Sequence, residues 1–296
     1  MSRIRIMALR HSAFYSPLLL TIAGGYLRDE GLEPSYGLAS AERTVPASIA
    51  DGSCDLAQSA VATSFPALER GEPVDIVHFA QINGRDGFFI VGRRPEPDFA
   101  WQRLKGRRVL VDHFFQPLAM FRYALHRNGM SLGDIDAVDA GGVEAIERAF
   151  RDGAADYAHF QGPVPQQLER DGLGHVLAAV GDAVGPVAFS SLCARRDWLT
   201  TPAAAAFMRA YRRGLKHAVG GDADEIAALL AAANFFPAID GAVLSSTISA
   251  YQRLACWRPD PLIPPAQYER LLDVFAFSGL ITRRHPYEAA IVAPPA

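Results

Sequence analysis

Hydrophobic and polar positions along the first ninety residues predict strands and helices in alternation. Segments 3–9 and 32–38 have the pattern of strands, and segment 16–30 has the pattern of an amphipathic helix between them. The alternation continues with helices at 44–51 and 61–69 and with strands at 55–59, 74–80 and 88–91. Strands that alternate with helices are typical of a mostly parallel sheet covered on both faces.

A polar segment with two prolines, residues 93–98, interrupts this pattern and is the best candidate for a crossing between two lobes. After it the alternation starts again, with strands at 108–111, 136–139, 156–160, 175–180 and 187–193 and helices at 117–128, 143–151 and 164–170. Beyond residue 200 the pattern changes to helices alone, at 201–217, 224–233, 240–255 and 265–277, followed by an apolar tail at 289–296.

Two α/β units followed by a helical tail predict two lobes joined by two crossings, the second near residues 187–195. The tail helices would return to cover the first lobe. We therefore expect residues 1–92 and 195–296 to form lobe 1 and residues 93–194 to form lobe 2. A chain of 296 residues is long enough for two such domains.

Composition and motifs narrow the function. Half of the residues are apolar, 21% are charged and the net charge is -3, so nothing indicates a nucleic-acid surface or a polybasic membrane patch. No segment reaches the roughly 20 apolar residues of a membrane span. The three cysteines have no disulfide or metal spacing, and GxGxxG, GxxxxGK[ST], GxSxG and HExxH are absent. We expect no cofactor and no metal.

Polar and aromatic side chains follow the predicted strands at the end where open α/β sheets bind ligands. Such a mixture is typical of a small-molecule pocket, and two of these segments precede helices whose N-termini favour an anion. Each side chain alone is equally compatible with a cap or a core position. As a set, the candidate ligand-binding residues are His11, Ser12, Phe14, Tyr15, Gln58, Ser59, Gln81, Asn83, His113, Phe114, Phe115, Gln116, His159 and Gln161.

Three of these residues, His11, His113 and His159, lie at or just beyond strand ends and would converge on one cleft. Convergent imidazoles bind metals or act as acid and base. Their spacing is not local and forms no metal motif, so hydrogen bonding to a ligand is the favoured interpretation. Asp112 would either orient His113 or cap the helix that follows.

Three segments carry a resemblance to a known family. They are Phe14-Tyr15-Ser16-Pro17-Leu18 with Gly25-Tyr26-Leu27 and Glu30-Gly31-Leu32, then Ile49-Ala50-Asp51-Gly52-Ser53-Cys54-Asp55-Leu56-Ala57, and then Leu104-Lys105-Gly106-Arg107-Arg108-Val109. With these segments the chain resembles the substrate-binding proteins of ABC importers for nitrate, sulfonates, taurine and thiamine-pyrimidine precursors. The resemblance implies the two-lobed type II periplasmic-binding-protein fold, a ligand in the interlobe cleft, an ABC permease as partner and a monomer.

One departure from that family bears on the ligand. Where the family carries small residues after a second-lobe strand, this chain has the bulky segment 112–116. A planar aromatic or heterocyclic ligand, or an anionic one, is therefore expected in place of a simple sulfonate or nitrate.

The compartment and the activity stay open at this stage. No signal peptide is recognisable, so we expect the periplasm if the sequence is a mature form and the cytoplasm if it is complete as written. The alternative function is a cytoplasmic enzyme on the same fold, of the thiamine-pyrimidine or menaquinone-precursor type, with His11, His113 or His159 as acid and base. A binding protein without catalysis is the favoured reading.

Overall fold

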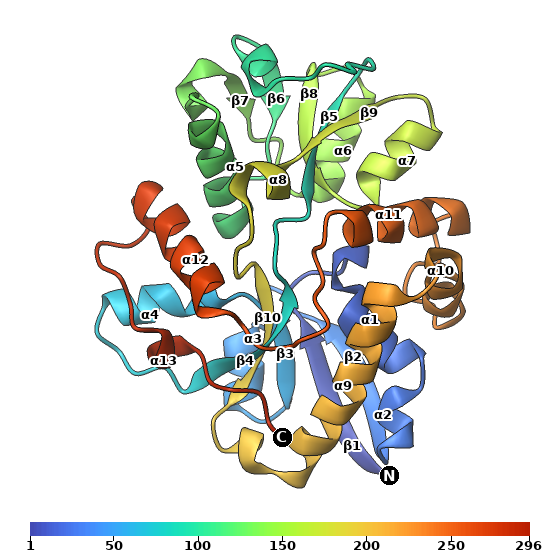
Figure 1. Ribbon diagram of the computed structural model, residues 1–296, viewed down its shortest axis with the longest axis vertical. Helices are drawn as coiled ribbons and strands as arrows, with labels where there is room; N and C mark the ends of the chain where they lie inside the picture. The colour runs from blue at the N-terminus through green and yellow to red at the C-terminus, as the bar shows by residue number, and fades with distance from the viewer.

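The computed structural model describes residues 1–296 and has two α/β lobes, each built on a five-stranded sheet (Figure 1). The first sheet has the order β2-β1-β3-β10-β4, and the second has the order β7-β6-β8-β5-β9. The strands are β1 Ser2–Ala8, β2 Leu32–Leu38, β3 Leu56–Ser59, β4 Ile76–Asn83, β5 Phe88–Gly92, β6 Arg108–Leu110, β7 Asp136–Val138, β8 Tyr157–Gln161, β9 His175–Ala179 and β10 Ser190–Arg195. The predicted division into two α/β lobes is confirmed.

Both sheets combine parallel and antiparallel pairs. β1 runs parallel to β2 and β3, and β6 runs parallel to β7 and β8. β10 is antiparallel to β3 and β4, and β5 is antiparallel to β8 and β9. Each sheet therefore receives one antiparallel strand directly next to a crossing between the lobes.

Helices cover the sheets and extend from the end of β10 to the C-terminus. The α-helices are α1 Ser16–Ala23, α2 Tyr26–Asp29, α3 Val45–Ala50, α4 Phe65–Glu69, α5 Phe115–Arg127, α6 Val143–Arg151, α7 Val164–Arg170, α8 Val180–Val184, α9 Pro202–Gly220, α10 Ala223–Ala232, α11 Gly241–Arg253, α12 Pro265–Phe277 and α13 Tyr287–Ala290. Short 3-10 helices are η1 Ala13–Tyr15, η2 Val61–Ser64, η3 Trp101–Leu104, η4 Leu132–Asp134 and η5 Trp198–Thr200.

The first crossing lies one strand before the position that the sequence predicted, whereas the second, between α8 and β10, overlaps the start of the predicted segment 187–195. β5 precedes the connector 93–98, yet it pairs with β8 and β9 of the second sheet, so the first crossing is residues 84–87. β10 belongs to the first sheet, although residues up to 194 were expected in lobe 2. Both strands are almost wholly buried, and a buried apolar strand carries no periodicity that assigns it to one sheet or the other.

The predicted helix at 16–30 is interrupted. It ends at Ala23, and Gly25 adopts a left-handed conformation with φ of 75° before α2 begins at Tyr26. A residue with a Cβ is strained in that conformation, so glycine permits the break there. The sequence predicted one continuous helix over 16–30, and the structure divides it at Gly24 and Gly25.

The tail helices pack on lobe 1 and also reach lobe 2. α9 and α10 contact α1, whereas α11 contacts α7 and α12 contacts α5 (Figure 1). The C-terminal helices therefore flank the crossings on two sides.

Because α9 packs closely on α1, adding one methyl group at this contact is expected to lower the stability of the protein. A Cβ on Gly214 would overlap Thr21 Oγ1 and lie 3.0 Å from the Pro17 carbonyl oxygen and from Thr21 Cα. We expect Gly214→Ala to lower the free energy of unfolding by about 1–3 kcal/mol, measured by urea denaturation. Gly220→Ala in the same helix meets nothing within 4 Å and should be neutral or slightly stabilising. Equal stabilities of the two variants would contradict this packing.

Candidate functional site

The two crossings lie against each other between the lobes (Figure 1). The Phe189 amide donates to the Asn83 carbonyl at 3.1 Å, and the Val187 amide donates to the Gly84 carbonyl at 3.0 Å. Asn83 Nδ2 donates to the Phe14 carbonyl at 2.7 Å. These bonds connect the two crossings to each other and to the loop after β1. The two crossings, which we call the hinge, and this loop therefore form one packed unit.

A glycine allows this close approach. A Cβ on Gly87 would overlap the ring of Phe14, which is fully buried. Phe14 also packs edge-on against Phe189, with ring centroids 5.3 Å apart. The phenylalanine is therefore part of the hinge core.

A narrow cavity of about 30 Å³ lies where the strand ends of the two lobes meet. Its lining comes from both lobes and from the crossings: Leu9, Arg10, Tyr15, Gln58, Ser59, Ala60, Phe88, Phe114, Gln116, Pro117, Gln161, Phe189 and Ser190. Four aromatic rings and one charged side chain, that of Arg10, are in this set. Pockets for drug-sized ligands measure about 300–1,000 Å³, so a ligand requires the lobes to separate or the lining to move.

Arg10 joins the two lobes at the cavity wall. Its Nη2 donates to Asp112 Oδ2 at 2.8 Å, and its guanidinium carbon lies 4.9 Å from the centre of the Phe114 ring. Asp112 is buried, and its Oδ1 accepts from the Phe114 amide at 2.9 Å. That second bond holds the carboxylate in place at the cavity wall. Phe114, 47% exposed, is the least enclosed aromatic wall.

Two glutamines of lobe 2 contribute polar atoms with no partner in the protein. Gln116 Nε2 donates to the Phe189 carbonyl at 2.7 Å, which fixes the amide orientation and leaves the buried Oε1 as a free acceptor. Gln161 Nε2 is a buried donor without a partner. An unsatisfied buried polar atom costs about 1–3 kcal/mol, so both atoms are suited to hydrogen bonds with a ligand.

Other contacts also link the lobes. Ser12 Oγ donates to the Gly162 carbonyl at 2.7 Å, and the Gly162 amide donates to the Tyr251 hydroxyl at 2.8 Å. On the other side, Arg270 Nη1 of α12 donates to the Tyr123 hydroxyl of α5 at 3.0 Å. The described conformation is therefore closed, and separating the lobes breaks contacts at the cavity and at the tail helices.

The structure brings part of the sequence-predicted set to this cavity. The predicted residues that line it are Tyr15, Gln58, Ser59, Phe114, Gln116 and Gln161. The Gln58 side chain is already engaged, since its Oε1 accepts from the amides of Leu9 and Arg10. It shapes the wall and leaves little hydrogen-bonding capacity for a ligand.

Other predicted residues lie outside the cavity lining. Ser12, Phe14 and Asn83 hold the crossings and the adjoining loop through the contacts described above. Gln81 points to α12, where its Nε2 donates to Gln267 Oε1 at 2.5 Å. Phe115 packs against Phe275, with centroids 5.2 Å apart.

None of the three candidate histidines lines the cavity. Both ring nitrogens of His11 are engaged, by the Tyr36 hydroxyl at 3.1 Å and the Phe235 carbonyl at 2.7 Å. His113 Nδ1 lies 2.9 Å from the Val111 carbonyl.

His159 is wholly buried and stacks between Phe88 and Phe121, with centroid distances of 4.5 and 4.9 Å. Burial lowers the pKa of His159 to about 3, so its imidazole is neutral at physiological pH. Neither ring nitrogen has a partner. The acid–base arrangement that the sequence suggested is therefore not assembled at the cavity.

The sequence pattern did not single out four lining residues, Arg10, Phe88, Phe189 and Ser190. Arg10 lies two residues after the end of β1, in one of the strand-end segments, and a cation at that place was a usable signal. Phe88, Phe189 and Ser190 belong to the crossings or their edges, and their position depended on where the crossings fall.

The two sheets and the cavity between them define a two-lobed α/β fold, and comparison with known sequences gives the family. The sequence model of the family described as "NMT1/THI5 like" matches residues 13–222, and the chain belongs to this family. A relative in Bacillus subtilis (strain 168) is YtlA, whose name describes it as a proposed binding protein. It is 25% identical over 296 residues, which covers 98% of this chain and 88% of YtlA.

Solved structures share the fold at low identity. The alkanesulfonate-binding protein SsuA from Xanthomonas axonopodis pv. citri, bound to MOPS, has a TM-score of 0.73 and 18% identity, with 99% of each chain covered. A zinc-bound ligand-binding component of an ABC-type import system from Staphylococcus aureus has a TM-score of 0.76 and 15% identity, covering 99% of this chain and 97% of that one. The periplasmic nitrate-binding protein NrtA from Synechocystis PCC 6803 has a TM-score of 0.63 and 16% identity, covering 82% and 69%.

Two further observations concern membranes and metals. No helix of the structure combines the length and the apolar character needed to cross a bilayer. No group of three or more His, Cys, Asp or Glu side chains is arranged to hold a metal ion.

Proposed function

We propose that this protein is the solute-binding component of an ABC-type importer and that its ligand is a small planar aromatic or heterocyclic anion. The observation that carries the proposal is the interlobe cavity, in which Arg10 is the one charged lining residue among four aromatic walls. The family and the solved relatives, among them the ligand-binding component of an ABC-type import system from Staphylococcus aureus, support the general role. The periplasmic face of a permease is the place where such a protein works.

The polar atoms define how the ligand is held. An anionic group of the ligand replaces Asp112 at the Arg10 guanidinium, which presents a planar fork of donors that matches a carboxylate. Gln161 Nε2 donates to a ligand acceptor and Gln116 Oε1 accepts from a ligand N–H group. The rings of Phe88, Phe114 and Phe189 enclose a flat body.

Binding begins with separated lobes and ends with closure. The ligand first contacts the strand ends of lobe 1, where Arg10 and Tyr15 lie, and lobe 2 then closes over it with Phe114 and the two glutamines. Closure removes water from the cavity and strengthens the ion pair with Arg10. A permease would recognise the closed arrangement.

Isothermal titration calorimetry with benzoate, nicotinate, ethanesulfonate and nitrate tests the ligand class. We expect the two aromatic carboxylates to bind at least 10-fold more tightly than ethanesulfonate and nitrate. The reverse order would overturn the planar aromatic ligand. Mass spectrometry of the recovered ligand tests the role, because a chemically changed product would show an enzyme in place of a binding protein.

A further inference from the structure

A second and larger concavity lies in lobe 1, with a volume of about 840 Å³. We call it the lobe 1 groove. Its lining is Leu9, Val45, Pro46, Ala50, Ser59, Thr63, Ser64, Ala67, Pro73, Val74, Asp75, Ile76, His78, Cys193, Arg195, Arg196 and Asp197. It adjoins the interlobe cavity at Leu9 and Ser59 and otherwise uses different residues.

The groove exists because one face of the first sheet is covered by short helices. α3 has six residues and α4 has five, whereas the opposite face is covered by α1 and by α9 with nineteen. Residues of α3 form one wall, and residues of η2 and α4 form the other. Strands β4 and β10 form the floor with His78 and Cys193.

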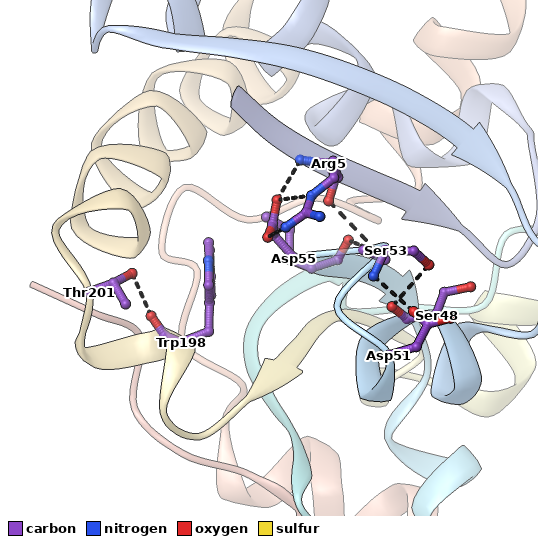
Figure 2. A network of polar contacts seen from close by, with 9 residues as sticks. Arg5, Ser48, Asp51, Ser53, Asp55, Trp198 and Thr201 are labelled. Atoms are coloured by element: carbon purple, nitrogen blue, oxygen red, sulfur yellow. Dashed lines mark hydrogen bonds and ion pairs between the residues drawn. The ribbon is translucent and has the colours of Figure 1, made fainter. Parts of the chain in front are cut away.

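The α3 wall is held to the sheet by a polar network (Figure 2). Ser53 donates from its amide to Asp51 Oδ1 at 2.8 Å and from its hydroxyl to the Ser48 carbonyl at 3.3 Å. Asp55 accepts from the Arg5 side chain of β1 at 2.5 and 3.0 Å. These bonds fix the turn after α3, so the groove has a defined wall.

The floor presents one buried polar side chain. His78 is 1% exposed, and its Nδ1 lies 2.8 Å from Ser191 Oγ. Burial lowers the pKa of His78 to about 3, so the ring is neutral. A neutral imidazole carries one hydrogen, and donation from the Ser191 hydroxyl to Nδ1 places that hydrogen on Nε2. Nε2 has no protein partner and is available to an acceptor in the groove.

One end of the groove is lined by four charged side chains, those of Asp75, Arg195, Arg196 and Asp197. Arg195 is paired with Asp197, but the Arg196 guanidinium has no carboxylate partner and lies 3.5 Å from the Glu288 carbonyl. The walls between this end and the cleft are mainly aliphatic, from Val45, Ala50 and Ala67. The groove thus combines an apolar channel, an imidazole on its floor and a charged end at which the Arg196 guanidinium has no ion-pair partner.

We propose that the lobe 1 groove is a second binding site, which takes an amphipathic anion with an apolar body and a carboxylate or similar headgroup. The volume lies within the range of small-molecule sites, about 300–1,000 Å³. The headgroup pairs with Arg196, the apolar body covers the aliphatic walls, and His78 donates to an oxygen of the ligand. This site is separate from the proposed transport ligand and does not depend on it.

Calorimetry with decanoate, below its micellar concentration, tests the site. Ala50→Trp places a bulky ring in the groove from an exposed position of α3 and should weaken decanoate binding at least 10-fold. Ala47→Trp is the matched control, since Ala47 is exposed on the same helix and does not line the groove. Undetectable decanoate binding, or equal affinity in the two variants, would overturn the proposal.

Charge recognition is tested by Arg196→Gln with Arg43→Gln, an exposed residue outside the groove, as control. Arg196→Gln should weaken decanoate about 10-fold and leave decanol unchanged. Equal losses for both compounds would refute a headgroup contact. Ala50→Trp should also keep the native affinity for benzoate, which separates this site from the interlobe cavity. A change of oligomeric state of Ala50→Trp in light scattering would show that the groove is an interface between copies.

Discussion

Arg10→Met is expected to lower the affinity for an aromatic carboxylate such as benzoate by roughly 100-fold, or about 2.7 kcal/mol. Arg10 is the one charged residue that lines the interlobe cavity, and its side chain is 22% exposed. Its loss leaves the ligand carboxylate without a counter-ion in a closed, poorly hydrated site. Calorimetry at constant ionic strength measures the change.

Two companion variants make this result specific. Asp112→Asn keeps the acceptor for the Phe114 amide and removes the charge that competes for Arg10, so anion affinity should rise several-fold. Arg28→Met removes an exposed ion pair with Glu33 elsewhere on lobe 1 and should have no effect. Native affinity in Arg10→Met, or weaker anion binding by Asp112→Asn, would mean that the pair only joins the lobes.

Asp86→Asn is expected to stabilise the protein in mildly alkaline solution. Asp86 lies in the first crossing, is fully buried, and accepts from the Phe88 amide through Oδ1 at 2.7 Å, while Oδ2 has no partner. Burial, with a smaller contribution from the negative charge of Asp112, raises the pKa of Asp86 from 3.8 to about 8. The folded protein therefore keeps a proton that the unfolded chain releases near pH 4.

The sign of the pH dependence follows from this difference. The preference of the folded protein for a protonated Asp86 contributes its full stability below the pKa that Asp86 has in the unfolded chain. This contribution to the free energy of unfolding is lost as the pH rises through the folded-state pKa of about 8. Asparagine has the same shape and no charge. We expect Asp86→Asn to unfold roughly 5–10 °C higher than the native protein at pH 8.5 and at the same temperature at pH 4.

Differential scanning calorimetry at the two pH values measures the effect. Asp98→Asn, at an exposed position of the 93–98 connector, should show no pH-dependent difference. A difference between Asp86→Asn and the native protein that is the same at pH 4 and pH 8.5 would argue against a protonated carboxyl in the crossing.

Much of the candidate site could be predicted from strand ends. Tyr15, Gln116 and Gln161 follow or end strands that the sequence located, and all three line the cavity. The rule works because the carboxyl ends of neighbouring strands meet at one edge of a sheet. The same rule could not separate a lining residue from a structural one, as Gln58 shows with its amide bonded to the β1 loop.

The histidines show the limit of that reasoning more sharply. His11 and His159 occupy comparable places in the sequence, yet the first is bonded to Tyr36 and Phe235 and the second is enclosed by two phenylalanines. The orientation of a side chain at a strand end depends on its neighbours in space. Those neighbours come from other elements, some more than 200 residues away.

By itself the sequence determined the two α/β units, most of the strands and helices, and the two-lobed fold, because these follow from local periodicity and from the family resemblance. The tertiary structure decided which sheet β5 and β10 join, that Arg10 meets Asp112 across the cleft, and that short helices leave a groove over β4 and β10. These features arise from contacts between residues far apart in the chain, and local patterns of polarity carry no information about such pairings.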